Sequence, residues 1–272
     1  MSSDTSVHAR PGTVPGAPHA PRARHLVDLV LHLARRQLDS QHRFTVLGWT
    51  WPLVRQLAQL AVFVFLFSKV LDLGIDDYAI FVFSGLMVWT WFQYGLQEAT
   101  RSLEVNRHLV FSPRFPDVAL PLIAVVAPVI DLLMALPVLL VLLIIDGRLG
   151  PTALLFPLVL LALAAFTAGL GMFTAATNVF FRDMTNIVGV GLLLLFYLTP
   201  IFFGLRNVPE RFQSFLQLNP MTSYVNATRA VLFEGRLPTL ANTLVMLVIG
   251  PLVFAVGLVV FRRLQPRFVD EL

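Results

Sequence analysis

The chain has 272 residues, of which 57% are hydrophobic and only 13% are charged. This composition, with a mean hydropathy of +0.76, excludes an ordinary soluble domain, in which about a quarter of the residues are charged. The net charge of +4 does not indicate nucleic-acid binding, because long apolar runs separate the basic residues.

The apolar runs define the class of protein. Several of them approach or exceed the ~20 residues that a helix needs to cross the hydrocarbon core of a bilayer. They are continuously apolar and do not alternate with polar residues, which excludes a transmembrane β-barrel. The sequence therefore predicts an all-α integral membrane protein with six spans, an N-terminal amphipathic interface helix and a re-entrant or interfacial helical segment before the last span.

The region before the first predicted span divides into two parts. Residues 1–24 are rich in Pro, Ser, Ala and Gly and lack the apolar core of a secretory signal, so they predict a disordered cytoplasmic tail. In residues 25–47, apolar side chains recur at helical spacing from Leu26 to Leu33, and charged, mainly basic, side chains occupy the other face. This pattern predicts an amphipathic helix on the cytoplasmic surface of the membrane.

Residues 48–262 form the predicted six-span domain. The spans are expected at about 49–71, 78–97, 118–145, 151–180, 187–203 and 240–261. The connections include a cytoplasmic loop at 102–115 and a mixed far-side segment at 205–237, and residues 263–272 form a cytoplasmic tail. Arginines are more numerous in the segments placed inside, which puts both termini in the cytoplasm. The single lysine, Lys69, against many arginines suggests a bacterium with a GC-rich genome.

The sequence lacks the motifs of nucleotide hydrolysis and metal binding. No GxxxxGK[ST] phosphate loop is present, because the one lysine is followed by valine. Cysteine is absent and the histidines do not have metal-ligand spacing. We therefore expect no catalytic residue, metal or cofactor in this chain. The pairs Gly169/Gly171 and Gly189/Gly191 lie inside apolar runs and predict close helix packing.

Polar and aromatic residues inside the spans are the candidates for function. Asp131 lies deep in the third span, where a carboxylate indicates either a functional group or a structural partner for Arg55 or a hydroxyl. Aromatic residues gather in the second span and near the fifth, and they suit either stacking on sugar rings or anchoring at the lipid interface. These residues are Trp89, Trp91, Phe92 and Tyr94, then Phe196, Tyr197, Phe202 and Phe203.

Three stretches carry a family resemblance. The first is LGWTWP at 47–52, directly after the amphipathic segment. The second is residues 78–116, and the third is residues 179–235, which contains FRD at 181–183, Thr199-Pro200-Ile201 and Asn219-Pro220. Together they resemble the membrane subunit of ABC transporters that export polysaccharides, the type-2 permeases for O-antigen, teichoic acid or galactan.

The resemblance implies a pore-forming subunit that does not hydrolyse ATP itself. Such a subunit pairs with a second copy of itself, and two separate ATPase subunits that bind ATP and Mg²⁺ dock on its cytoplasmic side. The cargo would be a lipid-linked polysaccharide, and the location the cytoplasmic (inner) membrane of a bacterium, among membrane lipids. The residues implied in coupling to the ATPase are Arg35, Arg36, Asp39, Glu104, Asn106, Arg107, His108, Arg182 and Asp183.

A lipid-linked cargo carries a pyrophosphate, which arginine binds well through its two-pronged guanidinium group. Aromatic rings would contact the sugars. The candidates for the substrate path are Arg36, Arg43, Trp49, Trp51, Arg55, Trp89, Trp91, Phe92, Tyr94, Asp131, Tyr197, Phe202 and Arg229.

Two other functions remain open at this stage. A type-2 exporter of drugs or lipids shares the six-span plan, but the LGWTWP entry and the far-side segment favour glycan export. An integral membrane glycosyltransferase or acyltransferase would need acid, base or metal groups at a membrane face. The sequence has no DxD motif, no histidine within a span and no paired carboxylates there, so it favours transport over catalysis.

Overall fold

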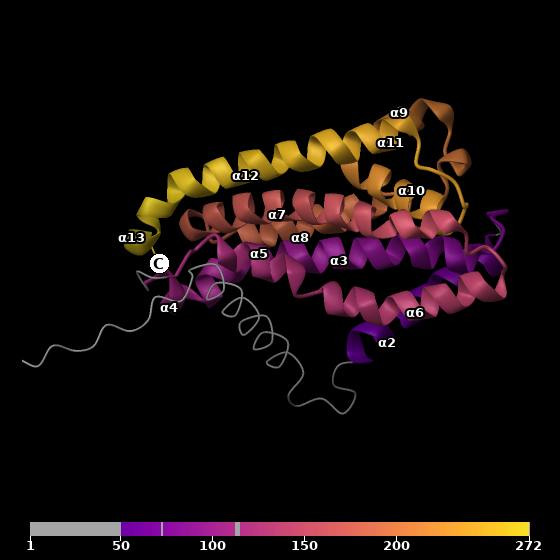
Figure 1. Ribbon diagram of the computed structural model, residues 1–272, viewed down its shortest axis with the longest axis horizontal. Helices are drawn as coiled ribbons and strands as arrows, with labels where there is room; N and C mark the ends of the chain where they lie inside the picture. Colours follow the sequence, from indigo (N-terminus) through magenta and orange to yellow (C-terminus); the bar gives the residue numbers. More distant parts are fainter. Residues whose placement is uncertain (1–49, 72, 112–114, 272) are drawn as a thin grey trace, which may run out of the picture.

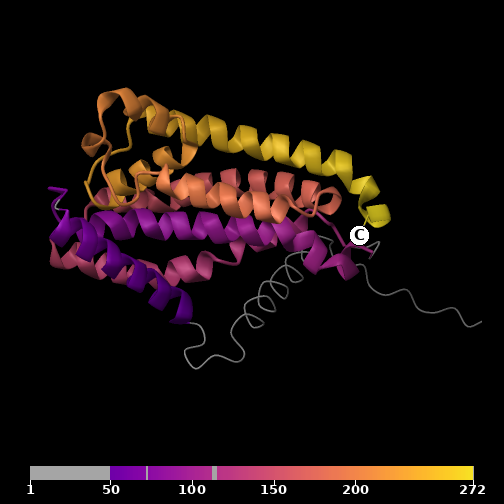
Figure 2. The same ribbon diagram turned by 180° about the vertical axis from the view of Figure 1, so that it is seen from behind.

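The computed structural model describes residues 50–71, 73–111 and 115–271 (Figure 1). Within these ranges every regular element is helical, and the long helices lie side by side (Figures 1 and 2). The amphipathic segment at 25–47, with Arg35, Arg36, Asp39 and Arg43, lies outside the described residues, and so does Trp49. The predicted all-α membrane fold is confirmed for the described part of the chain.

Within the described residues, five helices are long and apolar enough to cross a membrane. They are Trp51–Ser68, Tyr78–Val105, Ala119–Ile145, Pro151–Phe180 and Leu240–Glu271. The fifth predicted span, at 187–203, corresponds to helix α8 (Met184–Tyr197), which is apolar but has only 14 residues. At 1.5 Å per residue α8 is ~21 Å long, shorter than the hydrocarbon core. The predicted total of six spans therefore rests on α8 and stays a prediction.

Helix α3 (Tyr78–Val105) forms the centre of the core. Of the residues in its most apolar stretch, 78% are buried. It packs against α7 (Phe156–Phe180), α5 (Ala119–Val126), α6 (Val129–Ile145) and α10 (Pro220–Leu232). Because α3 has 28 residues, it also continues past the predicted end of the second span and includes the start of the expected 102–115 loop.

Several membrane-length helices are interrupted. Helix α2 (Trp51–Val64) continues as the π-helix η2 (Phe65–Val70). Pro128 separates α5 from α6 and divides the third predicted span, because a proline has no N–H to donate to the preceding turn. The 3₁₀-helix η3 (Pro151–Leu155) precedes α7. The last span consists of α11 (Leu240–Leu244), the π-helix η5 (Val245–Ile249) and α12 (Gly250–Leu264).

Helices α7 and α12 pack through glycine. A Cβ atom built on Gly169 would lie 2.5 Å from the backbone of Val253 and Phe254, and one on Gly257 would lie 2.0 Å from the Gly169 carbonyl oxygen. Only glycine allows two helix backbones to approach so closely. The prediction of close packing is thus confirmed for Gly169, and also for Gly171, where an added Cβ would lie 2.7 Å from the Ala99 side chain of α3. It is wrong for Gly189 and Gly191 within the described chain, because a Cβ there would meet open space.

The two ends of the helix array differ. At one end lie α4 (Arg107–Val110), the 3₁₀-helix η6 (Gln265–Arg267) and α13 (Phe268–Glu271); we call this the α4 end (Figure 1). At the other, the α9 end, lie η4 (Leu205–Asn207), α9 (Glu210–Gln217), α10 and α11. The short helices expected at 205–237 are therefore present. By the sequence prediction, the α4 end faces the cytoplasm.

Candidate functional site

A polar cleft lies between α2, α3 and α8. It has a volume of about 440 Å³, and each of the three helices contributes to its wall. Its polar lining is made of one arginine, three glutamines, a threonine and two tyrosines: Arg55, Gln56, Gln59, Thr90, Gln93, Tyr94 and Tyr197. Of the predicted substrate-path residues, the structure brings Arg55, Tyr94 and Tyr197 together here.

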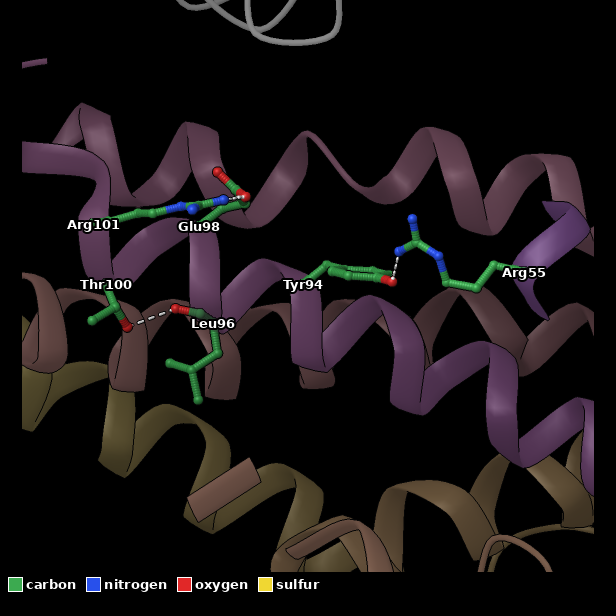
Figure 3. Close-up of polar contacts among 6 residues, drawn as sticks. All are labelled: Arg55, Tyr94, Leu96, Glu98, Thr100 and Arg101. Carbon is green, nitrogen blue, oxygen red and sulfur yellow. Dashed lines mark hydrogen bonds and ion pairs between the residues drawn. The ribbon is translucent and has the colours of Figure 1, made fainter. Parts of the chain in front are cut away.

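Arg55 and Tyr94 join the two sides of this cleft (Figure 3). The Arg55 guanidinium group donates a hydrogen bond to the Tyr94 hydroxyl, and its central carbon lies 5.7 Å from the centre of the tyrosine ring. Two turns further along α3, Arg101 forms an ion pair with Glu98 (Figure 3). Two arginines thus follow the same side of the helix array. Sequence reasoning proposed Asp131 as a partner for Arg55, but the contact that the structure gives Arg55 is with Tyr94.

Trp89 acts on the cleft through Gln93. The tryptophan is 1% exposed, and its indole N–H donates to the Oε1 atom of Gln93 at 2.8 Å. Because that bond uses the carbonyl side of the amide, the N–H₂ side of Gln93 is the one left for a ligand. Thr90, one turn before Tyr94, completes the α3 wall. Trp89 was predicted to stack on a sugar ring, but in the structure it orients the Gln93 amide, which lines the cleft.

Gln56 has an unusual environment. Its side chain lines the cleft but is only 5% exposed, and its Nε2 atom is buried without a hydrogen-bond partner among the described residues. An unsatisfied buried donor costs about 1–3 kcal/mol, so native proteins keep few of them. Gln56 lies three residues before Gln59 on α2, which places both amides on one helix face. Sequence reasoning missed these amides, although a polar residue inside a span is a recognisable signal.

The predicted aromatic cluster divides between core and cleft. Trp91 and Phe92 are 4% and 1% exposed, and the Trp91 indole N–H donates to the Val125 carbonyl oxygen. They therefore belong to the protein core, with Trp89. Tyr94 and Tyr197 reach the cleft, and Trp51 is exposed at the start of α2. Asp131 lies in the first turn of α6 and is partly buried.

A second aromatic group closes the cleft toward the α9 end. The ring of Phe202 lies 5.5 Å from that of Phe63 and 5.3 Å from that of Phe67, and Phe63 also contacts Phe196 at 6.2 Å. Phe63 and Phe67 follow the cleft-lining part of α2, while Phe196 ends its α8 wall. The predicted path residue Phe202 therefore lies in an apolar plug rather than among the polar lining.

Buried side chains hold the turn that carries Phe202. Arg229 donates to the carbonyl oxygens of Pro200 and Ile201 at 2.5 and 2.6 Å and to that of Phe81 at 3.2 Å. The Tyr78 hydroxyl donates to the Phe202 carbonyl oxygen at 2.6 Å. Three successive carbonyl groups are thus fixed from α10 and α3. Arg229 is 3% exposed, so its guanidinium group serves the backbone of this turn in the present structure.

The coupling residues within the described chain gather at the α4 end. Glu104, Arg107 and Arg182 line one groove of about 280 Å³ with Asn178 and Glu271. The Asn178 amide donates to Glu104 at 3.4 Å and accepts from the Thr185 hydroxyl at 3.1 Å, which links α3, α7 and α8. Sequence reasoning had not included Asn178.

Three other predicted coupling residues lie beside this groove in the chain. The Asn106 amide donates to the Ser102 carbonyl oxygen and so caps the end of α3. His108 and Asp183 are exposed. Among the described residues, no group of three histidine or acidic side chains could hold a metal ion.

The five membrane-length helices of the described residues, with a polar cleft between α2, α3 and α8 and a charged groove at the α4 end, are those of a multi-pass membrane protein. A family model described as "ABC-2 type transporter" matches residues 28–233, and the chain belongs to this family. It is 27% identical over 250 residues to the O-antigen export system permease protein RfbA of Klebsiella pneumoniae, covering 91% of this chain and 96% of that protein. It is 30% identical over 248 residues to the RfbA of Myxococcus xanthus, covering 90% and 95%.

Proposed function

We propose that this chain is the pore-forming subunit of an exporter that moves a lipid-linked polysaccharide across the bacterial cytoplasmic membrane. It works as a homodimer with two separate ATPase subunits, which bind ATP and Mg²⁺. The family and the similarity to two O-antigen export permeases support this function. The α4 end faces the cytoplasm, and both termini are cytoplasmic.

The observation that carries the proposal is that the polar cleft opens on the face formed by α2 and α8, most of which no other part of the described chain buries. Only 6% of the most apolar stretch of α2 and η2 is buried, against 78% for α3, and Tyr197 of α8 is 60% exposed. Arginine and glutamine side chains are costly in contact with lipid tails. A second copy packed across α2 and α8 covers them and closes the cleft into a pore. The open positions at Gly189 and Gly191 allow a partner helix to come close.

The lining chemistry suits a glycan on a phosphate-linked carrier. The amides of Gln59 and Gln93 are partly exposed in the cleft and can donate to and accept from sugar hydroxyls, whereas the buried Nε2 atom of Gln56 reaches a hydroxyl only when its side chain turns into the cleft. The Arg55 guanidinium group can bind a pyrophosphate with two parallel hydrogen bonds. An exporter of apolar drugs would have little use for three amides in its path, because each is expensive to desolvate.

The α4 end supplies the docking surface for the ATPases. Glu104 and Arg107 come from the end of α3 and the start of α4, while Arg182 precedes α8. Movement of an ATPase against this groove reaches α8, and so the cleft, through the hydrogen bonds of Asn178. The segment at 25–47 adds a second docking surface, and its removal should abolish export while the spans still insert.

Cysteine cross-linking tests the dimer, because the natural sequence has no cysteine. Leu193→Cys lies on the cleft side of α8 and should form a disulfide between two copies. Leu161→Cys on α7 is the matched control, because Leu161 is 67% exposed but distant from the cleft lining. The assay is performed in cells that make surface polysaccharide only with this chain and an active ATPase. Cross-linking of Leu161→Cys alone, or polysaccharide export without any ATPase, would contradict the proposal.

A further inference from the structure

A larger polar cavity lies at the α9 end. It has a volume of about 680 Å³ and shares no lining residue with the cleft. Its wall comes from several segments far apart in the sequence: the loop after η2, the turn after α6, η4, α10 and the start of α11. The volume is within the range of small-ligand sites. By the sequence prediction this end lies outside the cytoplasm.

One face of α10 is polar and lines this cavity. Thr222, Ser223, Asn226 and Arg229 all line it, at positions that fall on one side of the helix. The remaining buried face of α10 is largely apolar and packs on α3 and α7. Two of them serve the protein itself, because the Thr222 hydroxyl donates to the Leu216 carbonyl oxygen and Arg229 donates to the carbonyl oxygens of Pro200 and Ile201. Asn226 is partly exposed in the cavity, and contact with a polar ligand would explain it.

The charges of the cavity largely cancel. Arg148 pairs with Asp77 and, at 2.5 Å, with Asp146, while Arg236 pairs with Glu234 at 2.6 Å. Arg229 is engaged by backbone carbonyls. The other charged lining residues, Arg206 and Asp76, have opposite signs. Such a lining does not select a strongly charged ligand.

The uncharged part of the lining offers hydrogen bonds. Asn226, Asn242 and Gln217 present amides, and Ser223 presents a hydroxyl. Phe81 and Phe233 also line the cavity, but Arg229 lies 3.5 Å from the centre of the Phe81 ring and Arg148 lies 4.8 Å from that of Phe233, so a guanidinium group covers one face of each ring. The amides and the hydroxyl are the groups that can bind the hydroxyls of sugars.

We propose that this cavity at the α9 end binds a short, uncharged, hydroxyl-rich stretch of sugar chain on the outer side of the membrane. The source of the sugar rests on the proposed function: it is the cargo as it leaves the pore. The site is separate from the cleft, so cargo contacts it only after passing the aromatic plug.

The test uses the full chain with its ATPase in cells. Asn226→Cys places a thiol in the cavity, and Ser214→Cys on α9, which does not line it, is the matched control. A membrane-impermeant methanethiosulfonate is added outside, and the labelling rate is measured during export and with an inactive ATPase. We expect labelling of Asn226→Cys to be about threefold slower during export, the result of roughly two-thirds occupancy, and no change at Ser214→Cys.

Each other outcome is decisive. Equal labelling rates with and without export overturn the inference but leave the proposed function intact, because surface polysaccharide is measured in the same cells. Slowing that persists when glycan synthesis is abolished assigns the site to a lipid headgroup and also overturns it. Absence of surface polysaccharide even with the natural chain refutes the proposed function instead. If Asn226→Cys does not accumulate, Asn242→Cys probes the same cavity.

Discussion

Replacing Gln56 by leucine should stabilise the protein while it impairs export. The Nε2 atom of this amide is buried without a partner among the described residues, at a cost of about 1–3 kcal/mol. Leucine has a similar volume, so the substitution removes that cost without leaving a cavity. At roughly 3 °C per kcal/mol for a chain of this size, the apparent melting temperature should rise by about 3–9 °C. Export should fall about tenfold, because one lost hydrogen bond of about 1.4 kcal/mol to the cargo changes a rate by that factor.

The two effects are measured separately. Thermal unfolding is followed on the purified protein in lipid nanodiscs, and export is followed as surface polysaccharide per copy of the chain. Gln59→Leu is the matched control, because Gln59 lines the same cleft but is only partly buried, so it should lower export without raising the melting temperature. A melting temperature that stays the same or falls would show that the Gln56 amide is satisfied. Unchanged export would show that it does not touch the cargo.

Four further predictions follow from other contacts. Arg55→Lys should lower export about tenfold although the positive charge is kept, because lysine cannot both stack on Tyr94 and bind a pyrophosphate through two parallel hydrogen bonds. Equal export per copy of the chain would disprove the role of Arg55 in binding the pyrophosphate. Gly257→Ala should destabilise the chain by about 1–3 kcal/mol through its clash with α7, whereas Gly150→Ala, whose added Cβ meets only contacts at 3.8 Å or more, should not, as measured by melting temperature. Arg182→Glu should reduce co-purification of the ATPase, while Arg267→Glu, outside the groove, should leave it unchanged; a similar loss in both would indicate a general charge effect. Burial raises the pKa of the Asp117 carboxyl above its usual 3.8, against the opposing effect of the hydrogen bond from Gln265. The folded state therefore binds the proton more tightly than the unfolded state, and the stability of the protein should rise as the pH falls toward 3.8. Asp117→Asn should flatten this pH dependence of the melting temperature, and an unchanged slope would refute the role of Asp117.

The sequence predicted the spans well, because hydrophobicity integrated over twenty residues is a strong signal. It also placed Arg55 and Tyr94 among the substrate-path candidates, and the structure brings these two side chains into contact although they are 39 residues apart. It could not sort the aromatic residues of α3. Trp89, Trp91 and Tyr94 are close in the chain but point in different directions, since successive residues of a helix are turned by about 100°. Which of them reaches the cleft depends on where α2 and α8 pack.

Other features depended on contacts that one-dimensional patterns do not contain. Arg229 resembled a substrate contact because it is a cation in an apolar context, yet it donates to the carbonyl oxygens of a turn 28 and 29 residues earlier. Gly189 and Gly191 have the spacing of a packing motif, but no atom of the described residues lies within 4 Å of a Cβ built on either glycine. The glutamines were detectable in principle, since Gln56 and Gln59 lie inside a predicted span. They were overlooked because they carry no charge.

The three fixed carbonyl groups after α8 have a mechanical consequence. They hold the turn at Pro200–Phe202 in a fixed position. Helix α8 itself packs loosely, because Val188 and Leu192 are its only buried residues. A ~21 Å helix held at one end behaves as a lever, so a push near Asp183 produces its largest displacement at the α4 end and almost none beside the aromatic plug. In the proposed exporter, the α4 end of the cleft would then widen first, and cargo would enter before its exit opens. Alternating access would follow from where one helix is anchored.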